Sequence, residues 1–284
     1  MNEHGTLYVI PVPIGNLEDI TVRAQRILTE VDVIACEDTR TTGKLLDLLG
    51  IERPRLLSTH DYNEAKRIPA LIEMLEEGRN IALVSDAGTP TISDPGFRLI
   101  RGVLEAGIEP VPLPGACALT TALCVAGLPT DRFSFQGFLP HKPGPMKRCL
   151  EMLRSATETQ VFYVGPHHLS KVLTVAAGIL GEDRQAVIGR ELTKKFEEFR
   201  RGTLGELVDN PGTIRGEIVL MVEGHSGETC LSAEDLNSVI QDVLSEGLST
   251  SKAAKALAKR SGLDRSDAYQ KIMEFRENDA SGGR

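Results

Sequence analysis

Short apolar segments alternate with amphipathic segments over the first two thirds of the chain, and glycine or proline separates most of them. Short apolar runs are typical of buried strands, and apolar positions three and four residues apart are typical of helices. The alternation therefore predicts parallel strands connected by crossover helices. The expected strands are 7–12, 31–36, 81–85 and 110–113, and the expected helices are 21–30, 41–49, 64–77, 96–106 and 116–126.

A proline and an acidic residue interrupt this alternation at 128–131, which predicts a first domain over residues 1–127. A second domain over 128–225 is expected to contain the strands 132–137, 160–164, 186–190 and 217–223 with fewer helices. After a polar linker, the periodicity predicts helices at 233–245, 251–259 and 265–275 within a small module, 232–276. The last seven residues, 278–284, are expected to be disordered.

Composition narrows the functional class of the chain. Its 284 residues carry 32 Lys and Arg against 40 Asp and Glu, a net charge of −8 that excludes a uniformly basic nucleic-acid-binding surface. No apolar run is long enough to cross a membrane and the first residues do not resemble a signal peptide, so a cytoplasmic protein is expected. Five scattered cysteines form no CxxC pair, and no metal site is expected.

Four loops rich in Gly, Pro or acidic residues follow expected strands or precede the next helix, at 11–16, 37–40, 85–96 and 112–118. The carboxyl ends of parallel strands lie at one edge of a sheet, where such loops form a ligand site. None of the loops contains GxGxxG or GxxxxGK[ST], so neither a dinucleotide nor a P-loop site is indicated. Each loop alone could be an ordinary turn. Together they favour a site.

These loops and several later segments closely resemble one bacterial family, which methylates the ribose 2′-oxygen of a cytidine in small-subunit (16S) ribosomal RNA and has the tetrapyrrole methylase fold. The matching segments run in the same order from about residue 7 to residue 223. They are LYVIPVPIGNLEDIT, ACEDTRTTGKLL, THDYNE, ALVSDAGTPTISDPG, VPLPGACA, GFLP and GRELTK.

The resemblance implies an α/β fold of two αβα domains with a cleft between them, followed by a small C-terminal helical module. It also implies a homodimer and an S-adenosylmethionine site in the cleft. The residues implied to bind the cofactor are Pro13, Ile14, Asp86, Thr89, Cys117, Ala118, Tyr163, Val164 and Gly189. A carboxylate such as Asp86 can accept a hydrogen bond from an ammonium or hydroxyl group, although it could also simply order its loop through an Asx turn.

The chain departs from the family pattern in one important place. Where the family usually has FYESPHR, residues 162–168 read FYVGPHH, so a glutamate and an arginine are missing. A smaller departure is Ala116, which stands where the family often has the last proline of PLPGP. The first departure keeps open a non-catalytic RNA-binding assembly factor as one alternative. A tetrapyrrole-precursor C-methyltransferase on the same fold is another.

Methyl transfer to a hydroxyl requires positioning and a proton acceptor. The candidates for these roles lie in three charged clusters, each of which could equally be a set of surface ion pairs. Arg40 and Lys194 are expected to hold a phosphate or the developing alkoxide, and the expected proton acceptor is Asp38, His60 or Glu191.

RNA contacts on this acidic chain must be local. Residues 250–276 contain seven basic and three acidic side chains, a net charge of +4 that leaves −12 on the rest of the chain. A basic helical module predicts phosphate binding, and a merely solvated helical face is the alternative. The residues expected to bind small-subunit rRNA, within an assembled 30S particle, are Lys252, Lys255, Lys259 and Arg260, with Lys142, Lys147 and Arg148 in a second, mobile loop.

Overall fold

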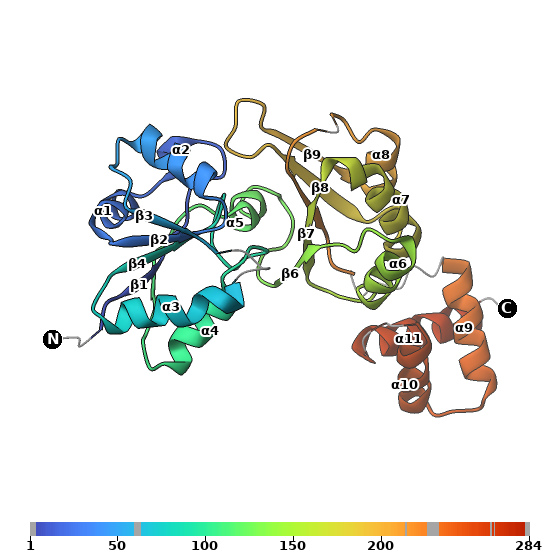
Figure 1. Cartoon of the computed structure of the whole chain (residues 1–284). Coiled ribbons are helices and arrows are strands. Elements are labelled where there is room, and N and C mark those ends of the chain that lie inside the picture. The colour runs from blue at the N-terminus through green and yellow to red at the C-terminus, as the bar shows by residue number, and fades with distance from the viewer. Residues whose placement is uncertain are drawn as a thin grey trace.

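The computed structural model describes residues 4–59, 64–213, 215–225, 233–261, 263 and 265–281. Two five-stranded sheets lie side by side in its main body, and three further helices stand apart from them (Figure 1). Among the described residues, no helix is both long and apolar enough to span a lipid bilayer.

The first sheet is entirely parallel, in the order β3-β2-β4-β1-β5. Apolar side chains cover both of its faces, as expected for a sheet with helices on each side. The strands are β1 (Leu7–Val9), β2 (Val33–Cys36), β3 (Arg55–Ser58), β4 (Ile81–Val84) and β5 (Val111–Pro112). The helices are η1 (Leu17–Asp19), α1 (Val22–Glu30), α2 (Thr39–Leu49), α3 (Glu64–Glu76) and α4 (Phe97–Glu105).

Local sequence signals fix where these helices begin and end. The Thr21 hydroxyl accepts a hydrogen bond from the Ala24 amide at the start of α1, and Asp38 does the same for the Arg40 amide in α2. Helix α2 ends at Gly50, whose φ of 68° is left-handed and favours glycine. Helices α1 and α2 pack on one face of the sheet and α3 and α4 on the other.

The second sheet has the order β6-β7-β10-β8-β9, and every pair except β6 and β7 is antiparallel. Its strands are β6 (Phe133–Phe138), β7 (Thr159–Val164), β8 (Gln185–Arg190), β9 (Glu198–Thr203) and β10 (Ile218–Val222). Helices α6 (Pro143–Met152), α7 (Leu169–Leu180) and α8 (Leu204–Asp209), with the short η2 (Pro166–His168), accompany them, and α6, α7 and α8 share one apolar core with this sheet.

Helix α5 (Ala118–Leu123) connects the two halves of the main body. It follows the last strand of the first sheet, yet Ala122 and Leu123 pack against Val161, Val187 and Met221 of the second sheet. The chain segment that leaves one sheet therefore covers the other, and this places the loop before α5 between the two sheets.

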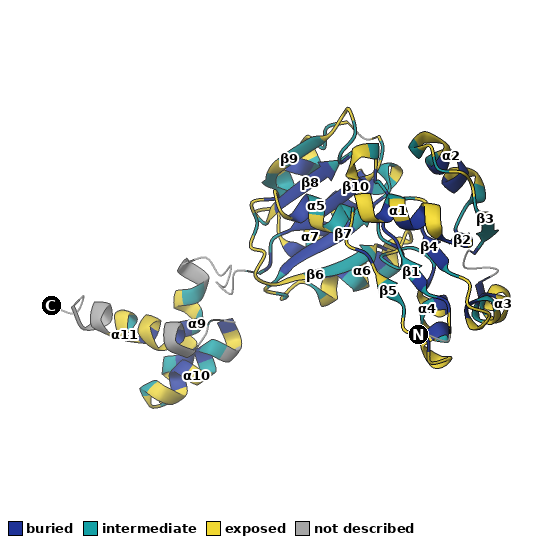
Figure 2. Ribbon diagram, turned by 90° about the vertical axis from the view of Figure 1, so that its left-hand side faces the viewer, coloured by how far each residue is buried: buried dark blue, intermediate teal, exposed yellow. Residues whose placement is uncertain are grey.

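The remaining helices, α9 (Ala233–Ser245), α10 (Thr250–Ser261) and α11 (Arg265–Ser281), form a separate cluster. They share an apolar core of their own, which includes Val243, Leu257 and Ile272, each with no exposed surface. Figure 2 shows this cluster beside the main body, with buried residues on its inner faces and exposed residues outside.

Several sequence-based expectations need correction. The edge strands β3 and β9 and the helices α6 and α7 were not expected, and the helix expected at 116–126 spans only Ala118–Leu123. Lys147 and Arg148 lie on α6 instead of in a mobile loop, because Met146 and Leu150, one turn apart, are buried in the core. Residues 278–281 continue α11, which extends the helix formed over its buried residues.

Candidate active site

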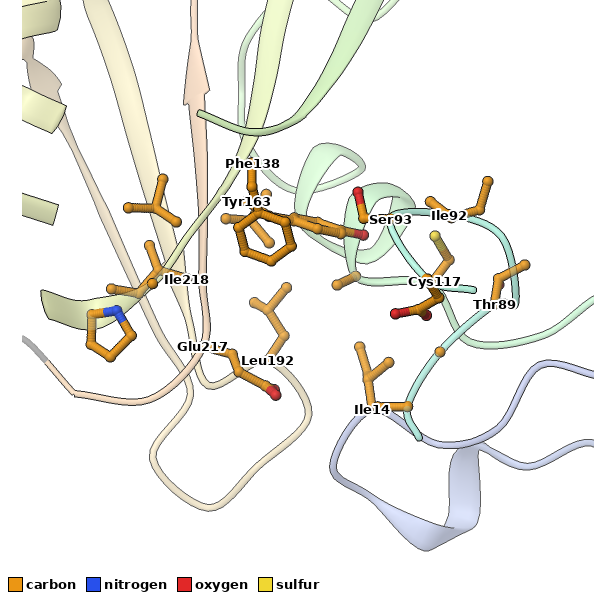
Figure 3. A pocket seen from close by; sticks show the side chains of 18 residues that line it. Ile14, Thr89, Ile92, Ser93, Cys117, Phe138, Tyr163, Leu192, Glu217 and Ile218 are labelled. Carbon is orange, nitrogen blue, oxygen red and sulfur yellow. The ribbon is translucent and has the colours of Figure 1, made fainter. Parts of the chain in front are cut away.

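A cavity of about 220 Å³ lies between the two sheets, lined by residues of both. The first half contributes Ile14, Thr89 and Cys117 from three of the four predicted loops. The second half contributes Tyr163 at the end of β7 and Leu192 from the loop after β8. Figure 3 shows these side chains facing one another across the cavity.

Hydrogen bonds between loops hold the first-half wall together. The Val12 and Gly88 backbones exchange two hydrogen bonds, of 2.9 and 3.0 Å. The Thr89 hydroxyl donates to the Ala116 carbonyl at 2.9 Å, which links the long loop to the loop before α5. Gly88 has a φ of 75°, and a Cβ there would lie only 3.2 Å from the Ile14 side chain. Glycine therefore permits this close approach.

Tyr163 connects the second sheet to helix α5. Its hydroxyl oxygen accepts a hydrogen bond from the Leu119 amide at 3.1 Å, and the rings of Phe135 and Phe138 lie edge-on to its ring. Burial raises the pKa of the Tyr163 hydroxyl well above its usual range. The side chain therefore remains neutral and acts as part of the wall.

The charged side chains that line the cavity are acidic. Among the described lining residues these are Asp94 and Glu217, and no lysine or arginine is present. Burial is the main cause that raises the pKa of Asp94 to about 6, and the negative charges of Glu37, Asp86 and Glu217 raise it further. The charged side chains of the cavity wall are thus acidic, which suits a cationic ligand.

A shallower depression of about 400 Å³ lies beside the cavity, formed by Glu37, Asp38, Thr39, Arg40, Ser58 and Asp86. Asp86 directly precedes the cavity residue Ala87, and its carboxylate accepts a hydrogen bond from the Asp38 amide at 3.1 Å. Two nitrogens of Arg40 donate to the Asp38 carboxylate, which holds the pKa of Asp38 at about 2. The Arg40 side chain is 85% exposed, so it can also contact a ligand.

Lys194 joins two acidic side chains next to the cavity. Its ammonium group lies 2.9 Å from a carboxylate oxygen of Glu191 and 2.9 Å from one of Glu217. The loop that carries it also contacts the first half, because the Thr193 hydroxyl accepts a hydrogen bond from the Asn16 amide at 3.1 Å. Glu191 and Thr193 both have left-handed φ angles, of 51° and 64°. This strained loop therefore connects the halves beside the cavity.

The nine predicted cofactor residues divide into two sets in the structure. Pro13 lies next to the lining residue Ile14, Gly189 packs behind Leu192, and Asp86 belongs to the neighbouring depression. The other six line the cavity directly: Ile14, Thr89, Cys117, Ala118, Tyr163 and Val164. Their contact with a cofactor stays a prediction.

Sequence reasoning did not select Asp94 or Glu217 as site residues. Asp94 belongs to the long loop from which Asp86 was chosen, and Glu217 lies directly before the apolar strand β10. The left-handed Thr91 and Ser93 precede Asp94, with φ angles of 74° and 64°. Only the position of both carboxyls at strand-end loops could have indicated them from the sequence.

The predicted catalytic residues fall into two groups that do not meet. Asp38 and Arg40 belong to the depression, whereas Glu191 and Lys194 belong to the loop after β8. His60 lies outside the described residues. Their catalytic roles stay predictions.

The predicted RNA-binding residues lie on two surfaces. Lys142 precedes α6, which carries Lys147 and Arg148, and all three are exposed. Lys252 and Lys255 are exposed on α10, Arg260 forms an ion pair with Glu246, and the side chain of Lys259 is not among those described.

The FYVGPHH departure lies at the cavity wall. Val164, Gly165 and Pro166 line the cavity, so the wall is apolar where a glutamate would stand at position 164. His168 packs against His141, with ring centroids 4.4 Å apart. Position 164 therefore supplies no charged group to the cavity, and any proton transfer or charge stabilisation there depends on other lining residues such as Asp94.

Comparison with known proteins identifies the family. Residues 6–208 match the family model described as Tetrapyrrole (Corrin/Porphyrin) Methylases. A protein of Escherichia coli O157:H7 named "Ribosomal RNA small subunit methyltransferase I" is 45% identical over 278 residues, which cover 96% of each chain. The chain belongs to the ribosomal RNA small subunit methyltransferase I family. Relatives of the same name in Synechocystis sp. and Bacillus subtilis are 44% and 43% identical, with alignments covering 94–98% of each chain.

Solved structures confirm the fold of this family member. The methyltransferase CobJ has a TM-score of 0.60 and 21% identity, and the match covers 81% of this chain and 97% of that one. A uroporphyrin-III C-methyltransferase of Thermus thermophilus, solved with S-adenosylhomocysteine, has a TM-score of 0.55 and 16% identity over 77% and 97% of the two chains. The α/β fold with two sheets is therefore the tetrapyrrole methylase fold.

Proposed function

We propose that this protein transfers a methyl group from S-adenosylmethionine to the ribose 2′-hydroxyl of a cytidine in small-subunit (16S) ribosomal RNA. The observation that most supports this proposal is the cavity between the two sheets, whose charged lining residues are acidic. The chain that contains it is similar to an rRNA methyltransferase over nearly its full length. The sequence motifs described above support the ribose hydroxyl as the acceptor.

The cavity fits the proposed cofactor in charge and in surface character. S-adenosylmethionine carries a sulfonium, an ammonium and a carboxylate, so its net charge is positive, and it supplies an activated methyl group when bound. Asp94 and Glu217 complement that charge, while Ile14, Leu192 and Val219 offer apolar surface for the rest of the molecule. Residues 87–89 and 117–118 line the cavity, so their backbone groups could orient the cofactor.

Arg40 is the group at the neighbouring depression that can hold the RNA backbone, because the other charged residues there, Glu37, Asp38 and Asp86, are acidic. Arg40 projects there with most of its side chain exposed, and guanidinium groups bind phosphate through two parallel hydrogen bonds. A nucleotide held by this arginine would have its ribose beside the cavity. The basic residues of α10 would supply further phosphate contacts at a distance from the cavity.

The proposed function is tested by incubating the purified protein with labelled S-adenosylmethionine and 30S subunits that lack the modification. Nuclease digestion and mass spectrometry should place the label on a cytidine ribose. Label on a base, or on a tetrapyrrole but not on RNA, would contradict the proposal. Calorimetry that detects no cofactor binding would instead favour the non-catalytic assembly factor.

Arg40→Ala should raise the KM for the 30S subunit by roughly 10- to 100-fold, because a charged hydrogen bond contributes about 1.5–3 kcal/mol. Affinity for the cofactor should change little. Arg101→Ala is the matched control, because Arg101 forms a similar exposed ion pair, with Glu105 on α4. A KM equal to that of the control would remove Arg40 from the RNA site.

We further infer that the protein acts as a homodimer on an assembled 30S particle. The family resemblance supports the dimer. The assembled particle is supported by the separate basic helices, which suit RNA that is already folded. Light scattering on the purified protein and a comparison of free 16S rRNA with 30S subunits test these two points.

A further inference from the structure

We infer that Asp94 is the catalytic proton acceptor for the ribose hydroxyl, acting where the cavity meets the depression that contains Arg40. This inference rests on the proposed function. Asp94 lines the cavity, whereas Glu37 and Asp86, whose charges act on it, lie in the depression. A ribose placed between the two hollows would therefore lie close to this carboxylate.

Three other carboxylates near the cavity, those of Asp38, Glu191 and Glu217, are already bound by cations. Burial also raises the pKa of Asp86, but its carboxylate accepts a hydrogen bond from the Asp38 amide and lines the depression instead of the cavity. Asp38 is held by Arg40, and Glu191 by Lys194, and these hydrogen bonds lower the pKa of both groups. Glu217 also contacts Lys194, and its side chain is 73% exposed. A carboxylate that is strongly stabilised by a cation is a weak base. Asp38 and Glu191 are thus poorly suited to take a proton, and Glu217 is held by Lys194 at an exposed position.

Asp94 has the opposite environment. Burial and three nearby carboxylates raise its pKa to about 6, and its hydrogen-bond partner is the Ser85 hydroxyl, which also has the Ala87 carbonyl oxygen within reach. General bases work best when their pKa lies near the operating pH. Asp94 is therefore ionised at neutral pH and still basic enough to assist.

The backbone before Asp94 supports a functional role. Thr91 and Ser93 both have positive φ angles, which cost free energy for residues other than glycine and are concentrated at functional sites. Gly96, with a φ of 122°, ends the strained segment where α4 begins. The fold maintains this strain while it directs Asp94 to the cavity.

The proposed step balances without a further reactant. The ribose O2′ forms a bond to the methyl carbon as the bond from that carbon to sulfur breaks, and the electron pair of the broken bond goes to sulfur. The O2′–H bond breaks, its electron pair stays on O2′, and the proton goes to the Asp94 carboxylate. Water then accepts the proton from Asp94.

The test compares Asp94→Asn with the wild type and with Asp209→Asn, an exposed aspartate on α8. Asp94→Asn removes one of the two negative side chains that line the cavity, so it should weaken S-adenosylmethionine binding by about three- to tenfold by calorimetry. Its single-turnover methylation of 30S subunits should fall by about 10²- to 10⁴-fold. Asp209→Asn should match the wild type in both measurements.

The pH dependence gives a second readout. Asp94 must lose its proton to act, so the wild-type rate should rise about tenfold per pH unit below about 6 and level off above it. The residual rate of Asp94→Asn should lack this rise. Carboxyl-carbon NMR of the free protein should show one aspartate that titrates near 6 and is missing from the variant.

Each contrary outcome has a distinct meaning. If wild-type protein places no methyl group on a ribose, the proposed function fails and the inference with it. If the wild type methylates ribose but Asp94→Asn retains the rate, Asp94 is not the base. If the variant loses cofactor affinity as much as activity, Asp94 is a cofactor ligand, and the inference is wrong.

Discussion

Removal of residues 226–284, which include α9–α11, should abolish productive binding to the 30S subunit while leaving cofactor binding intact. The three helices have a separate apolar core, so their loss exposes little of the main body. Residues 250–276 carry a net charge of +4 on a chain whose net charge is −8. The deletion removes eight basic and ten acidic side chains, so the remaining protein has a net charge of −6 and lacks the basic stretch of residues 250–276. It should therefore lose its phosphate contacts with the RNA.

Salt dependence distinguishes an electrostatic role for these helices from a purely structural one. Each phosphate that the truncated protein no longer neutralises should reduce the slope of log affinity against log salt by about 0.7–0.9. Filter binding at several salt concentrations should therefore show weaker affinity and a shallower slope for the truncated protein. Equal affinity for the subunit would show that the RNA footprint lies elsewhere.

A charge-reversal pair provides a version of this test that keeps the helices. Lys252→Glu with Lys255→Glu changes two exposed lysines three residues apart on α10, and neither forms an ion pair with a described residue. Arg23→Glu with Arg26→Glu makes the same change of charge at the same spacing on α1. The α10 pair should weaken subunit binding more than the α1 pair. Equal effects would indicate that only net charge matters.

The parallel half of the fold could be predicted because buried strands carry a strong apolar signal. Strands β1, β2 and β4 lie within the expected ranges, and Gly50 and Gly78 follow helices as expected. The edge strands lack this signal. Strand β9, Glu198–Thr203, is largely polar and is defined by its pairing with β8. Strand β3 contains only two apolar residues, Leu56 and Leu57, and neither is fully buried.

The location of the site could be predicted better than its side chains. Loops at the carboxyl ends of parallel strands must meet, whatever their sequences. The choice between Asp86 and Asp94 depends on how the long loop turns, and the left-handed Thr91 and Ser93 set that turn. Neither residue type signals such a conformation in a sequence. The sequence likewise did not predict that α5 packs on the second sheet. An amphipathic pattern shows that one face of a helix is buried, but not which sheet buries that face.

Gly15→Ala should reduce the rate of methyl transfer by up to roughly 100-fold, because a misplacement of about 1 Å can cost that much. A Cβ at position 15 would lie 2.3 Å from the Cγ atom of Lys194 and 3.0 Å from the Thr193 hydroxyl. Lys194 cannot swing away freely, because its ammonium group is bound by Glu191 and Glu217. The loop after β8 must therefore move away from the first half, and with it Leu192 and the cavity wall.

Gly178→Ala is the matched control for this prediction. It adds the same methyl group in the last turn of α7, where no heavy atom outside the helix's own backbone lies within 4 Å of the new Cβ. It should leave the rate unchanged and raise the free energy of unfolding by about 0.5–1 kcal/mol, the helix preference of alanine over glycine. If the clash with Lys194 is the cause, Gly15→Ala should have a much smaller effect in a Lys194→Ala background. Full additivity of the two substitutions would show that the loop contact does not transmit the damage.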